Sequence, residues 1–146
     1  MKRNYPERPI AAVGVVLLRQ DMVALIQRGN PPKKAQWSLP GGAQRVGETI
    51  QAAVQREVFE ETGLRITANG LVDVVDFVER DEAGLVQYHY TLIDYWAETE
   101  DTDLTAGDDA SDARWVPLAE LDALPIWSET KRVILRAAEL RERAHG

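Results

Sequence analysis

The chain contains no cysteine and only 2 histidines among its 146 residues. The absence of cysteine excludes disulfide bonds, zinc–thiolate sites and thiol nucleophiles, and it is typical of a reducing compartment. Positive charge is also scarce: 17 lysines and arginines stand against 24 aspartates and glutamates, which gives a formal net charge of −7. This balance argues against binding to a nucleic-acid backbone. An acidic protein that handles anionic phosphates needs cations as mediators.

Long apolar runs are absent as well. The run at residues 10–18 follows several basic residues, as in a signal peptide, but it is far too short to span a bilayer. Arg19, Gln20 and Asp21 follow it, where a signal peptide has small residues suited to cleavage. We therefore expect a soluble cytoplasmic protein that does not associate with membranes.

The length and the order of the apolar segments predict one α/β domain over residues 1–146, with residues 1–9 as a flexible or docking arm. The patterns predict a β-hairpin near the middle of a sheet, a short strand before a glycine pair, a central helix, two more strand regions, a turn at 81–84 and a final helix capped by Ser128. The expected strands are residues 10–18, 22–27, 37–39, 65–78 (one strand or two), 85–97 and 114–116. Loops are expected at 40–42 and 98–112, and the last helix from residue 128 to about residue 143.

The segment from Gly41 to Leu64 carries the chemistry. Thr49 is suited to cap a helix at its N-terminus, and Gly63 is suited to the left-handed residue that ends one. Helical spacing puts a set of apolar and acidic residues on one stripe, which begins apolar and finishes as three carboxylates. The stripe consists of Ile50, Ala53, Val54, Glu57, Glu60 and Glu61.

Two interpretations of these carboxylates compete. An acidic patch on a helix is usually a solvated face. However, the three carboxylates continue the stripe that should face the protein body, and like charges this close repel unless a cation lies among them. The helix also follows Gly41 and Gly42, whose backbone can approach a ligand closely. These two features favour a metal site, and oxygen ligands without histidine or cysteine favour Mg²⁺ or Mn²⁺.

This segment resembles the signature of the Nudix hydrolases. The matching residues are Gly42-x5-Glu48-x7-Arg56-Glu57-Val58-x-Glu60-Glu61-x-Gly63-Leu64. The resemblance implies an α/β/α sandwich with a mixed β-sheet. It also implies a Mg²⁺- or Mn²⁺-dependent pyrophosphohydrolase that acts on a nucleoside diphosphate linked to another group.

The resemblance further implies roles for individual residues. Glu57, Glu60, Glu61 and the backbone carbonyl of Gly41 are the expected metal ligands. Arg56 is expected to orient Glu57, and Glu48 to pair with Arg56 or to join the metal network.

Residues outside the helix are expected to complete the site. Asp109, in the acidic loop before residue 114, is our candidate for the general base, although this loop could equally be solvated. Arg28 and Arg45 are candidates for phosphate contacts, and the backbone at Gly42 for close approach to substrate. Tyr88, Tyr90 and Trp96 belong either to the core or to a surface that stacks on a base.

The phrases around Arg28, Trp37 and Asp109 resemble the branch of ADP-ribose pyrophosphatases, which implies AMP and ribose 5-phosphate as products. The chain departs from that branch in having no proline between Pro40 and Pro117. The alternatives are hydrolysis of (deoxy)nucleoside triphosphates and a non-catalytic nucleotide sensor. A homodimer is also possible, since several members of the family pair.

Overall fold

The computed structural model describes residues 2–29, 36–107 and 110–146, without the side chains of residues 110 and 111. Its strands are β1 (Ile10–Arg19), β2 (Met22–Arg28), β3 (Trp37–Ser38), β4 (Gly41–Ala43), β5 (Gly70–Arg80), β6 (Val86–Glu98) and β7 (Ala110–Pro117). Its helices are α1 (Ile50–Thr62), the 3₁₀ helix η1 (Leu118–Ala123) and α2 (Ser128–His145).

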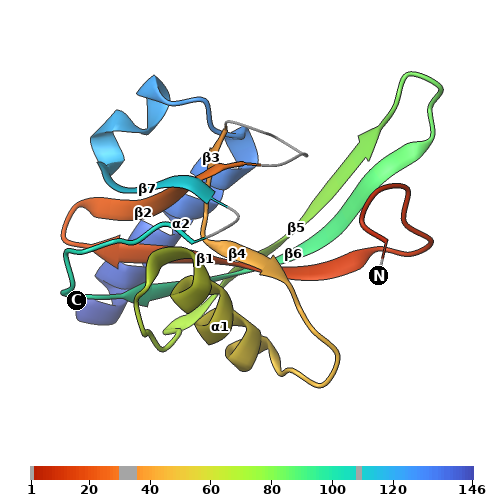
Figure 1. Cartoon of the computed structure of the whole chain (residues 1–146). Coiled ribbons are helices and arrows are strands. Elements are labelled where there is room, and N and C mark those ends of the chain that lie inside the picture. The colour runs from red at the N-terminus through yellow and green to blue at the C-terminus, as the bar shows by residue number, and fades with distance from the viewer. Residues whose placement is uncertain (1, 30–35, 108–109) are drawn as a thin grey trace.

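The strands form one mixed sheet in the order β3-β2-β1-β6-β5, with β4 paired to β1 and β7 paired to β2. The β1–β6 pair is parallel, whereas the other pairs are antiparallel. Helix α1 covers one face and α2 the other (Figure 1). The expected α/β/α sandwich with a mixed sheet is therefore confirmed.

Each face of the sheet has its own apolar core. On the α1 face, Val13, Val15 and Leu17 of β1 pack against Ala53 and other residues of α1. On the α2 face, the alternate residues of β1 and β2 pack against Val133, Ile134 and Ala137 of α2. Alternation along β1 explains the two cores, because successive side chains of a strand point to opposite faces. These two cores fix α1 and its carboxylates relative to the sheet.

The β5–β6 hairpin extends beyond the two helices that cover the sheet, and the N-terminal segment lies against it (Figure 1). The Tyr5 hydroxyl donates to Asp81 over 2.7 Å, and the Tyr5 backbone N–H donates to the carbonyl of Gln87 over 2.7 Å. The segment expected to be flexible or docking is thus held by hydrogen bonds to the hairpin. None of the helices in the described ranges is long and apolar enough to cross a membrane.

Some sequence-based expectations about the strands were wrong. The glycine pair lies in strand β4, not in a loop, because Gly41 and Gly42 pair with Gly14 and Val13 of β1. Strand β7 begins at Ala110 and not at residue 114, because its pairing with β2 continues as far as Arg28. Residues 65–69 precede β5 and are not a strand.

The start of α2 also differs from the expectation. Its N-cap is Trp127, without a side-chain hydrogen bond, and Ser128 is the first helical residue. The Trp127 ring packs edge-on against Phe77 of β5, with 5.4 Å between ring centroids. Helix α2 therefore begins at a ring contact with the β5–β6 hairpin and not at a side-chain cap.

Candidate active site

Helix α1 has the caps that the sequence predicts. The Thr49 side chain accepts a hydrogen bond from the N–H of Ala52, and Gly63 closes the helix with a φ of 79°. The predicted stripe is only partly correct: α1 buries Ala53, Val54, Glu57, Val58 and Thr62. Glu61 is half-buried and Glu60 is exposed, so the three carboxylates enter the site to different depths.

Glu57 is the deepest of these carboxylates and lies against the glycine strand. It is 9% exposed, and a Cβ added to Gly42 would lie only 2.7 Å from its carboxyl atoms. Burial raises the pKa of Glu57, and the Arg56 guanidinium opposes this effect without cancelling it. The missing side chain at residue 42 therefore makes room for a carboxylate at the edge of the sheet.

Arg56 links the carboxylates to one another. Its Nε donates to Glu48 over 2.6 Å, and its Nη1 donates to Glu57 over 2.6 Å and to Glu60 over 3.2 Å. Its Nη2 donates to the Ala43 carbonyl over 3.0 Å, which ties the helix to β4. The contacts expected of Arg56 with Glu57 and Glu48 are present.

The Glu48 carboxylate is fixed from two sides. Both of its oxygens accept hydrogen bonds from Arg56, and one also accepts the Arg45 backbone N–H over 2.8 Å. These bonds, with the Arg56 contact foremost, lower the pKa of Glu48 to about 2. Glu48 consequently stays ionised over the physiological range and holds Arg56 in place.

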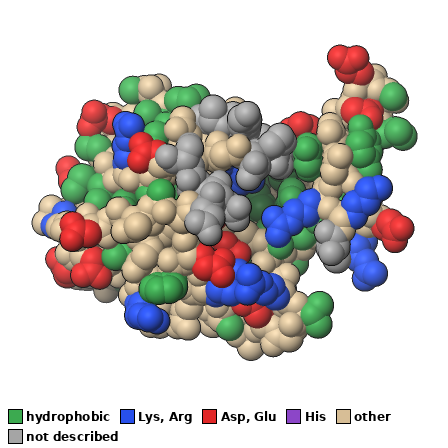
Figure 2. All heavy atoms as spheres, in the orientation of Figure 1, with side chains coloured by type: hydrophobic (Ala, Val, Ile, Leu, Met, Phe, Trp, Pro, Cys, Tyr) green, Lys and Arg blue, Asp and Glu red, His purple; other side chains and the backbone are tan. Residues whose placement is uncertain are grey.

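Glu61 reaches the glycine strand by a different route. Its carboxylate accepts the backbone N–H of Gly41 over 2.9 Å. Two of the three predicted metal ligands, Glu57 and Glu61, therefore lie against Gly42 and Gly41. Glu60 lies on the rim, where its carboxylate is 3.6 Å from the Arg45 guanidinium. Figure 2 shows acidic and basic side chains side by side on this part of the surface.

The chemistry of these donors suits a hard divalent cation, since carboxylate oxygens and a backbone carbonyl are the ligands that Mg²⁺ and Mn²⁺ prefer. Among the described residues, however, no three acidic or histidine side chains converge closely enough to hold a metal ion. The carboxylates bond instead to Arg56 and to the Gly41 N–H. The donors fit in kind, and Glu57 and Glu60 share the Arg56 Nη1, so they already lie near one another.

The other predicted residues are Arg28, Arg45 and Asp109. Arg28 ends β2, where it pairs with Ala110 of β7, and its backbone N–H donates to the Gln36 carbonyl over 2.9 Å. Arg45 is exposed beside Glu60. Asp109 lies outside the described residues. The roles assigned to these three residues stay predictions.

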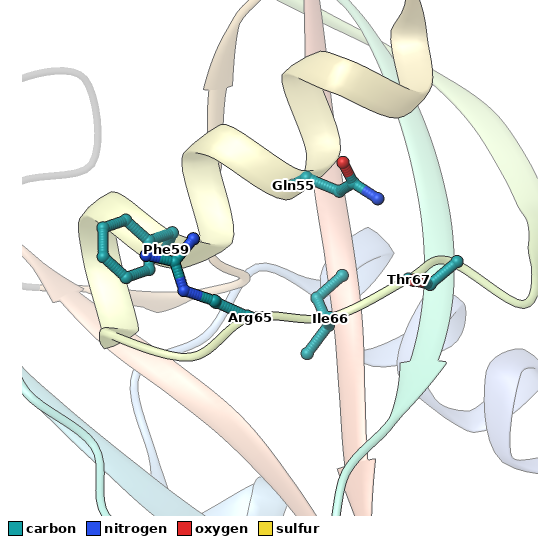
Figure 3. Close-up of a pocket in the computed structure, with 5 residues that line it drawn as sticks. All are labelled: Gln55, Phe59, Arg65, Ile66 and Thr67. Atoms are coloured by element: carbon teal, nitrogen blue, oxygen red, sulfur yellow. The ribbon is translucent and has the colours of Figure 1, made fainter.

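A pocket lies on another part of the α1 surface, between α1 and the segment that follows it. Figure 3 shows its lining, with the Arg65 guanidinium stacked on the Phe59 ring at 4.4 Å from the ring centroid. The other lining residues are Gln55, Ile66 and Thr67. None of the five is acidic or was predicted for the site, so this pocket does not alter the location of the candidate site.

Asp94 on β6, which is 5% exposed, was not among the residues predicted for the site. Burial raises the pKa of Asp94 to about 7, and the neighbouring Asp73 carboxylate adds to the effect. The signal in the sequence was a single acid in the alternating row of Tyr90, Leu92 and Trp96. Of the aromatic residues left open between core and base stacking, Trp96 belongs to the core, and Tyr90 lies near Phe77 with 6.3 Å between ring centroids.

We expect Asp94 to make the stability of the folded chain depend on pH. Its pKa is higher in the folded chain than its ordinary value of 3.8, so the folded state binds more protons between about pH 4 and pH 7. The free energy of unfolding should therefore fall as pH rises through this window, by at most about 1.4 kcal/mol per pH unit. Asp94→Asn should flatten this decline and raise stability at pH 8, as measured by urea unfolding at several pH values. Asp76→Asn, at an exposed position of β5, should keep the wild-type slope; an unchanged slope in Asp94→Asn would contradict the assignment.

Comparison with known proteins agrees with the fold and with the glycine–helix segment. The family model described as "NUDIX domain" matches residues 8–137. An ADP-ribose pyrophosphatase of Methanocaldococcus jannaschii is 36% identical over 116 residues, which are 80% of this chain and 66% of that protein. A human 8-oxo-dGDP phosphatase is 44% identical over 62 residues, which are 42% of this chain but only 19% of that protein.

Among solved structures, the NUDIX domain of Shewanella oneidensis NrtR in complex with ADP ribose superposes with a TM-score of 0.76. It is 26% identical, and the match covers 95% of this chain and 90% of that one. The match thus covers less than two thirds of the length of each of these two relatives, but nearly all of this solved domain. With the family model matching most of its residues, the chain belongs to the NUDIX family.

Proposed function

We propose that the chain is a Mg²⁺- or Mn²⁺-dependent pyrophosphohydrolase that cleaves ADP-ribose, or a closely related nucleoside diphosphate derivative, into a nucleoside monophosphate and a sugar phosphate. The observation that carries the proposal is the joint placement of Glu57 and Glu61 against Gly42 and Gly41, with Arg56 between Glu48, Glu57 and Glu60. The archaeal ADP-ribose pyrophosphatase and the ADP-ribose complex supply the substrate class.

In this proposal each residue of the cluster has a distinct task. Glu57, Glu60, Glu61 and the Gly41 carbonyl would hold the metal ion. When bound, such an ion offsets phosphate charge and lowers the pKa of an attacking water. Glu48 fixes Arg56, and Arg56 in turn orients Glu57 and Glu60. Because these carboxylates do not converge on one point among the described residues, binding of the metal ion would have to draw them together.

The substrate side needs positive charge and close backbone approach. Arg45, on the rim beside Glu60, and Arg28, at the end of β2, are the proposed phosphate contacts, because guanidinium groups bind phosphate oxygens in pairs. The backbone at Gly42 allows the diphosphate to approach the sheet edge. Asp109 remains the proposed general base. In the reaction, a water oxygen bonds to one phosphorus as the water gives up a proton to a base, and the bond from that phosphorus to the bridging oxygen breaks. The other phosphate leaves with the bridging oxygen.

Hydrolysis of an oxidised nucleoside di- or triphosphate is the second candidate, because the human relative named for 8-oxo-dGDP shares 44% identity over 62 residues. Both candidates need the same carboxylate cluster and differ in the group beyond the diphosphate.

A substrate panel with Mg²⁺ tests the proposal. We expect ADP-ribose to have a kcat/KM at least about tenfold above those of NADH, diadenosine polyphosphates, nucleotide sugars, nucleoside triphosphates and 8-oxo-dGTP, which corresponds to roughly 1.4 kcal/mol of preferential transition-state binding. AMP and ribose 5-phosphate should form in equal amounts, and excess EDTA should stop the reaction. Preference for 8-oxo-dGTP would favour the second candidate, whereas no hydrolysis of any compound would contradict both.

A further inference from the structure

Asp94 lies level with Gly41 of the candidate active site across three neighbouring strands of the sheet. Gly14 of β1 pairs with Gly41 on one side and with Asp94 on the other. Neighbouring strands are about 4.8 Å apart, so the backbones of Gly41 and Asp94 are about 10 Å apart. A Cβ at Gly14 would collide with the Asp94 carboxyl. The carboxyl therefore leans over Gly14, the residue that separates it from Gly41.

The Asp94 side chain is nearly buried and has no polar partner among the described residues. It is 5% exposed, and among the residues that the structure describes no hydrogen bond or salt bridge reaches it. A buried polar group without a partner is costly and needs a reason to be present. The positive charge of Arg132 on α2 acts on Asp94 without an ion pair between them. The Arg132 guanidinium binds Asp73 over 2.9 Å and Glu129 over 2.9 Å instead.

The surroundings restrict what could bind at Asp94. Asp73 pairs with Asp94 across β5 and β6, so two carboxyl groups face the same side and would repel a phosphate. Apolar residues also lie on this side of the sheet: Leu92 of β6, Leu39 and Trp127 belong to one core cluster. Farther along the hairpin, Phe77 contacts both Tyr90 and Trp127. An uncharged group with hydroxyl or amino donors and a flat apolar surface suits these neighbours.

The distances along the hairpin match such a group. Tyr90 and Asp94 are four residues apart on the same face of β6, which corresponds to roughly 13 Å along a strand. Figure 2 shows the surface hollowed between the hairpin and the rest of the molecule. The phosphate side, at Gly41 and Arg56, and the apolar side, along β6, therefore adjoin one another through Gly14.

We propose that Asp94 is a specificity-determining residue that accepts a hydrogen bond from the ribose 2′-hydroxyl or the base amino group at the nucleoside end of the substrate. This proposal rests on the proposed function, since it takes the diphosphate to lie at the glycine strand. It sets the orientation of the substrate: the phosphates lie toward Gly41, and the uncharged nucleoside lies along the α2 face of β6.

Calorimetric titration of the wild-type chain with nucleotide monophosphates tests the proposal without relying on turnover. The probes are AMP, 2′-deoxy-AMP, IMP and ribose 5-phosphate, with Mg²⁺ at pH 8.5, where Asp94 is ionised and only accepts hydrogen bonds. Loss of a hydrogen bond to a charged group costs about tenfold or more in affinity. We expect AMP to bind at least tenfold more tightly than one of its two analogues. Weak binding of 2′-deoxy-AMP identifies a ribose hydroxyl as the donor, and weak binding of IMP identifies the base amino group.

Variants of the same position complete the test. Asp94→Leu keeps a similar side-chain size but removes both acceptors, so it should weaken AMP at least tenfold and erase the preference among the analogues. Asp94→Asn keeps one acceptor and should fall between Leu and wild type. In hydrolysis assays both variants should raise KM while changing kcat only a few-fold. Asp76→Asn, on the opposite face of β5, should leave all these values unchanged.

The outcomes separate this proposal from the proposed function. Equal binding of AMP and both analogues by the wild type, or no measurable AMP binding, overturns the role of Asp94 even if ADP-ribose is hydrolysed. Discrimination that depends on Asp94 supports it even if the substrate panel shows another preferred substrate. If Asp94→Leu does not fold, the comparison of probes on the wild type decides the matter.

Discussion

Glu61→Gln and Glu60→Gln should each lower kcat for the preferred substrate at least about 10²-fold, because a charge that holds a metal clamp on the reacting phosphates is lost. The two substitutions test the same role, metal binding, at a half-buried residue and at an exposed one. Glu61 accepts the Gly41 N–H over 2.9 Å, whereas Glu60 lies on the rim near Arg45. A glutamine at residue 61 can still accept that hydrogen bond, so the fold should be kept while the charge is removed.

The control for these variants is Glu139→Gln, which removes an exposed carboxylate of α2 that pairs with Arg136. It should leave kcat unchanged, because α2 lies on the other face of the sheet from α1. It should also leave the fold intact, because a surface ion pair contributes less than about 1 kcal/mol to stability. Steady-state kinetics with Mg²⁺, together with a circular-dichroism check of folding, make the comparison. Near-normal turnover by a folded Glu60→Gln or Glu61→Gln protein would show that the ligands are wrongly assigned.

Alanine substitutions at the two adjacent glycines should differ in effect: Gly41→Ala should lower stability, and Gly42→Ala should lower activity. At Gly41 an added Cβ would collide with the backbone carbonyl of Val13 and approach the Cα of Gly14. Backbone of a central strand cannot yield easily, so Gly41→Ala should destabilise the protein by about 3 kcal/mol or more. At Gly42 the added Cβ would meet the Glu57 carboxylate at 2.7 Å, and that side-chain end can move.

Gly42→Ala should therefore remain folded but lose activity, by about 10²-fold if the displaced Glu57 no longer takes part. Urea unfolding and steady-state kinetics on both variants separate the two effects. Gly47→Ala offers a control for added bulk, since nothing lies within 4 Å of a Cβ at this position, although its φ of 89° adds local strain. A fully active Gly42→Ala protein would remove Glu57 from the proposed mechanism.

The features that depend on short stretches of sequence could be predicted. Thr49 and Gly63 cap α1 as expected, because a cap is decided by a few neighbouring residues. The β1–β2 hairpin and the turn before β6 follow from apolar runs separated by polar residues. Glu48, Arg56 and Glu57 lie within ten residues of one another, so their contacts follow once the helix is known.

The features that were missed depend on pairing between distant segments. The glycine pair becomes a strand only because β1 offers an edge to it, and β7 starts early only because β2 continues to Arg28. Trp127 replaces Ser128 as the cap position where its ring meets Phe77, which lies 50 residues earlier in the chain. The position of Asp94 beside Gly14 likewise follows from the parallel β1–β6 pairing, which the spacing of residues along the chain does not reveal.

The central claim is that the carboxylates of α1 beside the glycine strand hold a divalent cation. The most direct test is a titration with Mn²⁺, in which electron paramagnetic resonance measures the free ion. The wild type and Glu139→Gln should bind Mn²⁺ alike, whereas Glu57→Gln, Glu60→Gln and Glu61→Gln should each bind it at least about tenfold more weakly, as one charged ligand is worth several-fold or more in affinity. Mn²⁺ binding of equal strength in the wild type and in all three variants would contradict the account.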